Sequence, residues 1–177
     1  MQVDILRYEI LLQIGGLYVD MDIKRLGNFE DIHPFWDFYV GLASQDVGTV
    51  EINNALIGSI PEHDIIRDVL DHIYKHKSKS FSATKTVLSN INLSSLLDDS
   101  ESHTLSKILN QHSIDSVITE TGPGLFTKIV LKSKDCFVFP SKAFYPLPNT
   151  KRGKAEKYIS IDATSYAVHY WGCKWQT

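Results

Sequence analysis

The sequence predicts an α/β fold, because segments with helical periodicity and segments typical of β-strands follow one another along the chain. Residues 3–14 carry apolar side chains at helical spacing. Residues 17–19 and 36–43 are rich in the aromatic and branched side chains that strands favour. A second helical pattern follows Pro61, so helices and strands are expected in one domain that spans residues 1–177.

The first expected element is a helix over residues 3–14, followed by a pair of glycines and a short buried strand at 17–19. Asp4 and Arg7 stand at i and i+3, and therefore share a face of this helix. One interpretation is a surface ion pair that contributes about 0.2–1 kcal/mol. The other is an acid and a base that point at the hydroxyl groups of a bound sugar.

The next elements are expected to be strands and a helix. Residues 36–43 predict one strand, and residues 50–60 predict a pair of strands around Asn53-Asn54, where the asparagines form either a turn or a functional segment. Pro61 is expected to open a helix. The apolar stripe of this helix consists of Ile65, Ile66, Val69, Leu70 and Ile73.

The second half of the chain begins with a polar, serine-rich stretch at residues 77–116. Its apolar residues recur in helix-like groups, which predicts two helices joined by the acidic loop 98–101. Residues 121–124, Thr-Gly-Pro-Gly, predict a tight turn before the apolar segment 125–130. Residues 136–148 predict a strand and a loop that contains prolines.

Composition narrows the classes of protein. The chain has 177 residues, 43% of them hydrophobic, and a formal net charge of −3, which suits one globular domain and argues against nucleic-acid binding as the main role. No stretch is long and apolar enough to predict a membrane span or a signal peptide. The two cysteines predict free thiols rather than a disulfide framework or a cysteine zinc site.

The most informative motif is the acid pair Asp20 and Asp22, which directly follows the strand at 17–19. Two acids at i and i+2 at the end of a strand can bind one hard divalent cation, directly or through water. Such a cation can bridge two phosphates and neutralise charge on a leaving group. A D-x-D pair alone is more often a solvated turn, so the surrounding residues decide its meaning.

Those surroundings resemble a known family. The segment DILRYEILLQIGGLYVDMDI closely resembles the sugar-binding region of the D-x-D glycosyltransferases, with Val3 where the family usually has serine. That family includes fungal initiating α-1,6-mannosyltransferases, animal α-1,4-galactosyltransferases and bacterial capsular polysaccharide enzymes, and clostridial glucosylating toxins are more distant relatives. The positions in register are Asp4, Arg7, Tyr8, Leu11, Gly15, Gly16, Tyr18, Asp20 and Asp22.

The resemblance implies a GT-A-like nucleotide-diphospho-sugar transferase fold. It also implies that the N-terminal strand–helix–strand segment of that fold, which holds the nucleotide base, does not precede Asp4 and Arg7 in this sequence. An open parallel sheet that lacks its first strands would expose an edge. We therefore expect an N-terminally incomplete catalytic domain, with another chain as one candidate to complete the sheet. Residues 77–116 would form a helical insertion on the acceptor side.

The resemblance also implies roles for single residues. Asp22 would bind Mn²⁺ or Mg²⁺ directly, and Asp20 would contact the ribose and a metal-bound water. Asp4 and Arg7 would hold hydroxyl groups of the donor sugar. The residues expected to contact the donor are Tyr18, Asn54, Gly122, Lys174 and Trp175.

The C-terminal segment resembles the closing motif of the family, A-x-H-H-W-x-x-S-W. His169, Trp171 and Trp175 match it, whereas Tyr170 replaces the second histidine and Lys174 replaces the serine. His169 would complete the metal shell of Asp20 and Asp22, or it is a hydrogen-bonded histidine of the core. An ammonium cannot bind a cation, but Lys174 could pair with a leaving phosphate.

The function implied is a retaining, metal-dependent glycosyltransferase that uses a UDP- or GDP-linked sugar and a glycan or glycolipid acceptor, with no role for nucleic acid. The alternative is a truncated, inactive fragment or subunit that binds sugar nucleotide. A metal-dependent phosphoesterase is disfavoured, because a two-metal site needs more acids and histidines. The sequence selects neither the donor sugar nor the compartment, which would be the cytoplasm for a bacterial enzyme and the Golgi lumen for a eukaryotic one.

Overall fold

The computed structural model describes residues 2–43, 48, 50–88, 117–151 and 164–172, and for residues 77–88 the backbone alone. The helices are α1 (Gln2–Ile14), α2 (Asp64–Leu88), α4 (Pro123–Val130) and α5 (Ser141–Phe144), with short 3₁₀ turns at Phe29–Asp31, His33–Phe35 and Asn149–Lys151. The strands are β1 (Gly16–Val19), β2 (Ile23–Arg25), β3 (Phe38–Leu42), β4 (Ile52–Ser59), β5 (Phe137–Phe139) and β6 (Ala167–His169).

The described strands form two sheets. The larger has the order β1-β4-β3-β5, in which β1–β4 and β3–β4 pair antiparallel and β3–β5 pair parallel. The smaller consists of β2 and β6, which pair antiparallel. The α/β class is confirmed as a mixed α/β structure, but the expectation of a parallel sheet is wrong, because β4 runs antiparallel to both of its neighbours.

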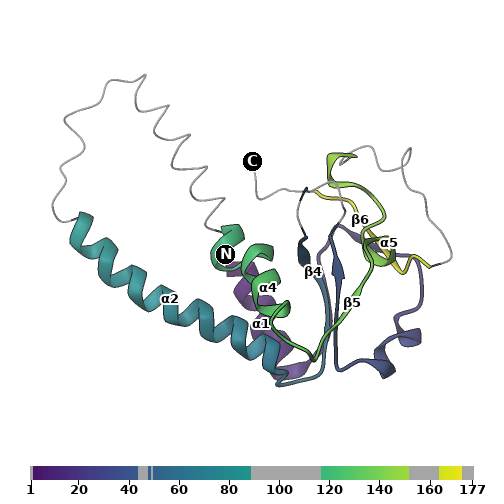
Figure 1. Ribbon diagram of the computed structural model, residues 1–177, viewed down its shortest axis with the longest axis horizontal. Coiled ribbons are helices and arrows are strands. Elements are labelled where there is room, and N and C mark those ends of the chain that lie inside the picture. The colour runs from purple at the N-terminus through teal and green to yellow at the C-terminus, as the bar shows by residue number, and fades with distance from the viewer. Residues whose placement is uncertain (1, 44–47, 49, 89–116, 152–163, 173–177) are drawn as a thin grey trace.

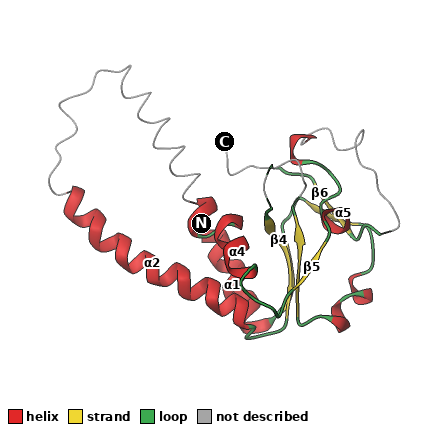
Figure 2. Ribbon diagram, in the orientation of Figure 1, coloured by secondary structure: helices red, strands yellow, loops and turns green. Residues whose placement is uncertain are grey.

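Helices cover both faces of the larger sheet. Helices α1, α2 and α4 lie on one side of it, while α5 and strand β6 lie on the other (Figure 1). Figure 2 shows the strands between these two groups of elements. Two clusters of buried side chains correspond to the two faces, because successive residues of a strand point to opposite sides. Val40 and Ile57 belong to one cluster, and Tyr39 and Leu56 to the other.

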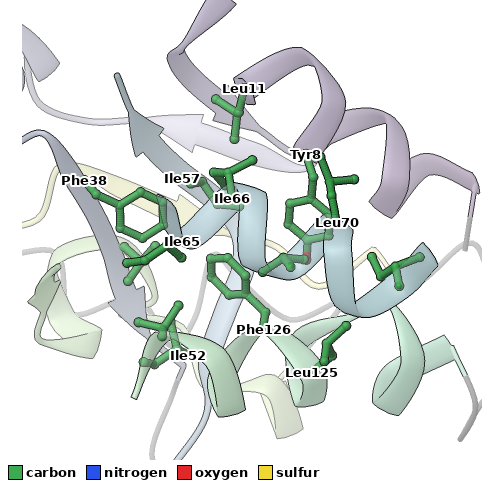
Figure 3. Packing of buried hydrophobic residues seen from close by; sticks show 14 residues of the cluster. Tyr8, Leu11, Phe38, Ile52, Ile57, Ile65, Ile66, Leu70, Leu125 and Phe126 are labelled. Atoms are coloured by element: carbon green, nitrogen blue, oxygen red, sulfur yellow. The ribbon is translucent and has the colours of Figure 1, made fainter. Parts of the chain in front are cut away.

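The first cluster joins α1, α2 and α4 to the sheet (Figure 3). Tyr8 of α1 stacks on Phe126 of α4, with ring centroids 5.8 Å apart. The whole predicted stripe of α2 is buried in this cluster, which confirms the helix after Pro61. That helix begins at Asp64 rather than at Pro61, because residues 61–62 form a turn.

Two other predicted boundaries are wrong. Residues 50–60 form one strand rather than two, because Asn53 and Asn54 are buried inside β4 and do not form a turn. Residues 77–88 continue α2, so the expected helical insertion at 77–116 does not begin a new helix there. The rest of that segment, residues 89–116, lies outside the described residues.

The buried face of helix α1 is not the one on which most of its apolar residues lie. Its buried residues are Asp4, Arg7, Tyr8 and Leu11. The apolar residues Val3, Leu6, Ile10 and Ile14 are exposed, at 61%, 58%, 43% and 72%. The interpretation of Asp4 and Arg7 as a surface ion pair is therefore wrong, since both side chains lie between α1 and β4.

The backbone conformation after α1 explains why two glycines stand there. Gly15 and Gly16 have φ values of +67° and +97°, which side chains with a Cβ rarely adopt. A Cβ on Gly15 would also lie 2.6 Å from the nitrogen of Pro61. This reversal brings β1 back along the helix, and so places the acid pair at the end of β1 beside α1.

The buried ring of His63 makes a pH dependence of stability testable. His63 stacks on Phe38 with ring centroids 4.7 Å apart. Burial lowers its pKa below 6.5, although Asp64, Asp37 and Asp135 oppose the shift. At a pH between the lowered pKa of the folded state and the value of 6.5 for the unfolded state, the unfolded chain binds more protons than the folded one. His63 therefore makes the free energy of unfolding rise with pH up to about 6.5 and stay level above it. The test is urea unfolding of the wild type and of His63→Gln from about pH 5 to 7.5. The free energy of unfolding of the wild type, relative to that of the variant, should rise with pH up to about 6.5. Parallel profiles would contradict the prediction.

Candidate functional site

The acid pair lies in a tight turn between β1 and β2. The backbone N–H of Asp20 donates to the carbonyl of Ala55 at 2.8 Å, which continues the pairing of β1 with β4. The N–H of Ile23 then donates to the carbonyl of Asp20 at 3.0 Å and closes the turn. This turn sends Asp20 toward helix α1 and Asp22 toward strand β6.

Asp22 is held by the C-terminal strand. One carboxylate oxygen, Oδ1, lies 3.0 Å from Nε2 of His169, and the other, Oδ2, accepts from the N–H of Gly172 at 2.6 Å. The carbonyl of Asp22 also accepts from the N–H of Tyr170 at 2.9 Å. Trp171, between these donors, has a φ of 56°, a left-handed conformation that non-glycine residues seldom adopt. Such strain often accompanies a functional constraint, and here it accompanies a backbone N–H directed at Asp22.

His169 is buried and has an electrostatic reason to stay neutral. Burial lowers its pKa, and the Asp22 and Asp20 carboxylates only partly oppose this shift. A neutral imidazole offers one unprotonated nitrogen, which is what a metal ion requires. The Nδ1 atom has no hydrogen-bond partner among the described residues.

Asp20 faces the opposite side of the turn. Its Oδ1 lies 3.3 Å from Nη1 of Arg7 and accepts from the hydroxyl of Tyr18 at 2.8 Å. Burial raises the pKa of Asp20, while the Arg7 guanidinium and the Tyr18 hydrogen bond favour the ionised carboxylate. Burial also raises the pKa of Tyr18, so its hydroxyl keeps the proton that it donates.

Arg7 links two acidic residues, Asp4 and Asp20. Its Nη2 lies 3.1 Å from Oδ1 of Asp4, and its Nη1 donates to the carbonyl of Asn54 at 2.6 Å. The guanidinium carbon lies 4.6 Å from the centre of the Tyr18 ring. The side chain is only 6% exposed. Its Nε has no hydrogen-bond partner among the described residues.

An irregularity in β4 makes the Asn54 carbonyl available to Arg7. The pairing of β3 with β4 moves from Val40–Ile57 to Gly41–Asn53, so residues 54–56 have no partner on β3. β-bulges of this kind release backbone groups and are frequent beside active sites. The same stretch brings the side chain of Asn54 to Asp4, with Nδ2 3.4 Å from Oδ1.

The predicted metal ligands meet in space. One ligand atom from each of Asp20, Asp22 and His169 lies within 4.8 Å of the other two. Two carboxylates and a neutral imidazole fit a divalent cation, because the carboxylates suit Mg²⁺ and Mn²⁺ and the imidazole suits transition metals. The structure therefore provides a candidate metal site, although hydrogen bonds within the protein already occupy part of it.

The structure brings most of the predicted site residues together. Asp4, Arg7, Tyr18, Asp20 and Asn54 form one continuous network, and Asp22 with His169 adjoins it. Lys174 and Trp175 lie outside the described residues. Their predicted roles stay predictions.

Gly122 stands apart from this network. It is the N-cap of helix α4, which begins at Pro123, so the turn predicted at 121–124 covers only residues 121–122. A Cβ on Gly122 would lie 2.9 Å from the carbonyl of Val117, so the close approach that requires glycine is to the chain itself. Its predicted contact with the donor is not tested by the structure.

Sequence reasoning missed three groups of this site. The hydroxyl of Thr121 donates to Asp4, the hydroxyl of Tyr8 accepts from Asn54, and the N–H of Gly172 donates to Asp22. In the sequence, Tyr8 and Thr121 could have been found because they are the neighbours of two predicted site residues, Arg7 and Gly122. A backbone donor such as the N–H of Gly172 cannot be identified from the residue type, because every residue except proline has a backbone N–H.

In the described helices, no segment is both long and apolar enough to cross a membrane. No curated protein matches the chain. Residues 1–39 match the family model described as the glycosyltransferase sugar-binding region containing the DXD motif. That range includes helix α1, strand β1 and the acid pair, and it confirms the resemblance seen in the sequence. The similarity to the glycosyltransferase sugar-binding region thus covers the first 39 residues of the chain.

Proposed function

We propose that this protein transfers a sugar from a UDP- or GDP-linked donor to a hydroxyl group of a glycan or glycolipid, with Mn²⁺ or Mg²⁺ as cofactor. The observation that carries the proposal is the convergence of Asp20, Asp22 and His169 beside the buried Asp4–Arg7 pair. The two carboxylates and the imidazole suit a cation, whereas the Asp4–Arg7 pair suits sugar hydroxyl groups. Both lie in or directly contact the segment that matches the family model.

Each group of residues has a separate task in this proposal. Asp22 and His169 would hold the cation, and a bound cation would supply the positive charge that offsets the negative charge of the departing diphosphate. Asp20 would contact the ribose and a water beside the cation. Asp4 accepts hydrogen bonds from hydroxyl groups of the donor sugar, Arg7 donates to them from Nε, and Tyr18 packs against the donor.

The positions of Asp20 and Asp22 support this division. Arg7 and Tyr18 hold Asp20 from the side of α1, whereas Gly172 and His169 hold Asp22 from the side of β6. Fixed carboxylates need little reorganisation when a charged ligand arrives, which is the physical basis of electrostatic preorganisation. In this proposal Lys174 would pair with the leaving phosphate, and Trp175 would cover the nucleotide or the sugar.

The finer parts of the proposal concern architecture and stereochemistry. The domain spans residues 1–177 and has the GT-A arrangement, with residues 77–116 on the acceptor side. The anomeric configuration is retained, with the acceptor attacking from the face that the diphosphate leaves. A trapped covalent sugar–enzyme adduct would contradict this last point.

The test uses the full chain with a panel of UDP- and GDP-sugars, Mn²⁺ or Mg²⁺, and EDTA as the metal-free arm. We expect one donor to be hydrolysed or transferred in the presence of metal and not with EDTA. Binding of a donor without turnover would support the alternative of an inactive sugar-nucleotide-binding protein. Neither binding nor turnover with any donor would overturn the proposal.

A further inference from the structure

Asp4 is held by a closed ring of buried hydrogen bonds that joins three elements. Asn54 Nδ2, from β4, lies 3.4 Å from Asp4 Oδ1 and donates to Tyr8 Oη at 2.9 Å. Tyr8 Oη, from α1, donates to the carbonyl of Thr121 at 3.1 Å. The Thr121 hydroxyl, which precedes α4, donates to Asp4 Oδ2 at 3.1 Å and closes the ring.

Within this ring, the hydroxyl of Thr121 contacts only Asp4. Its hydroxyl has one hydrogen and two nearby acceptors, Asp4 Oδ2 at 3.1 Å and the carbonyl of Val117 at 3.3 Å. The shorter contact leads to a carboxylate, and hydrogen bonds to charged acceptors are the stronger ones. The hydrogen therefore belongs to the Asp4 contact, and the residue itself is 1% exposed.

The two oxygens of Asp4 are thus held by different partners. Arg7 and Asn54 hold Oδ1, and Thr121 holds Oδ2. A carboxylate held at both oxygens keeps one rotamer, and hence one orientation toward any ligand beside it. Without the Thr121 hydroxyl, Oδ2 would lose its donor from the α4 side and the orientation would loosen.

We infer that Thr121 is a positioning residue for donor-sugar recognition, since it fixes the Asp4 carboxylate in the orientation that binds the sugar. This inference rests on the proposed function, because it needs Asp4 to contact the sugar. It goes further by separating two parts of the ligand. Thr121 acts on the sugar through Asp4, whereas the nucleoside diphosphate is bound by the cation site.

Thr127, on the helix α4 that follows Thr121, provides a matched control. Its hydroxyl accepts from the N–H of Ile52 at 2.8 Å and donates to the carbonyl of Ile52 at 3.2 Å, so it ties α4 to β4 without touching Asp4. Thr127→Val removes a hydroxyl from the same structural unit as Thr121→Val does. A purely structural role of Thr121 would make the two variants behave alike.

The experiment measures the dissociation constants of the full chain for a sugar nucleotide and for the matching nucleoside diphosphate, UDP or GDP, by calorimetry with Mn²⁺. For Thr121→Val we expect affinity for the sugar nucleotide to fall about tenfold, the scale of one hydrogen bond to a charged group, with affinity for the diphosphate unchanged. Thr121→Ser should restore wild-type binding, and Thr127→Val should leave both constants unchanged. If Thr121→Val does not fold, Thr121→Ala decides, because it removes the same hydroxyl from a smaller side chain and should show the same selective loss.

The outcomes separate the two proposals. Equal losses for both ligands, or a Thr121→Val profile like that of Thr127→Val, would overturn the inference and leave the proposed function standing. A wild-type protein that binds no sugar nucleotide more tightly than the diphosphate, and hydrolyses none, would overturn both.

Discussion

Asp22→Asn is expected to lower metal-dependent turnover of the sugar nucleotide about 10²- to 10³-fold, the scale seen when one electrostatic group of a catalytic site is removed. The asparagine oxygen can still accept a hydrogen bond from Gly172, which now donates to Oδ2 at 2.6 Å. The charge is lost, however, and hard divalent cations depend on anionic oxygen ligands. The local fold should therefore survive while binding of the cation fails. Initial rates across a range of Mn²⁺ concentrations measure this effect.

The control for this variant is Asp68→Asn, which changes an exposed carboxylate of α2. It should keep wild-type turnover and wild-type dependence on Mn²⁺. Urea unfolding of both variants shows whether a loss of rate is a loss of fold. Equal turnover of the wild type and Asp22→Asn would remove Asp22 from the proposed mechanism.

Arg7→Met is expected to lower the free energy of unfolding by about 3–5 kcal/mol, the cost of removing one partner from a buried ion pair. Methionine fills a similar volume, but it leaves the carboxylates of Asp4 and Asp20 without their cation, 3.1 and 3.3 Å from where the Arg7 nitrogens lie. The carbonyl of Asn54 also loses a donor at 2.6 Å. Urea unfolding followed by circular dichroism measures the loss.

An exposed pair with the same chemistry supplies the comparison. Arg67 contacts Asp64 at 2.6 Å, with side chains 49% and 88% exposed. Arg67→Met should change stability by about 0–1 kcal/mol, because solvent screens surface ion pairs. If Arg7→Met proves as mild as Arg67→Met, the buried network does not stabilise the fold as described.

The beginning of the chain could be predicted because its pattern is local. The helix over 3–14, the glycine pair and the strand at 17–19 follow from periodicity and spacing within one short segment, and all are present. Which face of α1 would be buried could not be predicted in the same way. Its apolar residues suggested one face, but the Asp4–Arg7 pair lies on the buried one, since β4 offers the carbonyl and amide of Asn54 as partners.

The chain between 50 and 60 shows the limit of local patterns. An Asn-Asn pair favours a turn by intrinsic preference, yet β4 passes through it. The amide of Asn54 donates to Tyr8 of α1, and the side-chain oxygen of Asn53 accepts from the N–H of Ala55 within β4. Contacts such as Thr121 to Asp4 join residues 117 positions apart. No spacing rule reaches that far, and for His169 only the resemblance to a family motif linked the tail to the acid pair.

The two-stranded sheet of β2 and β6 has a consequence for how the protein is made. His169 follows Asp22 by 147 positions, so the candidate metal site cannot assemble until almost all of the described chain has left the ribosome. Contacts between such distant residues carry a high entropic cost of closure and tend to form late in folding. Asp20 and Asp22 are therefore without His169 during most of synthesis, and the candidate metal site is complete only late in folding.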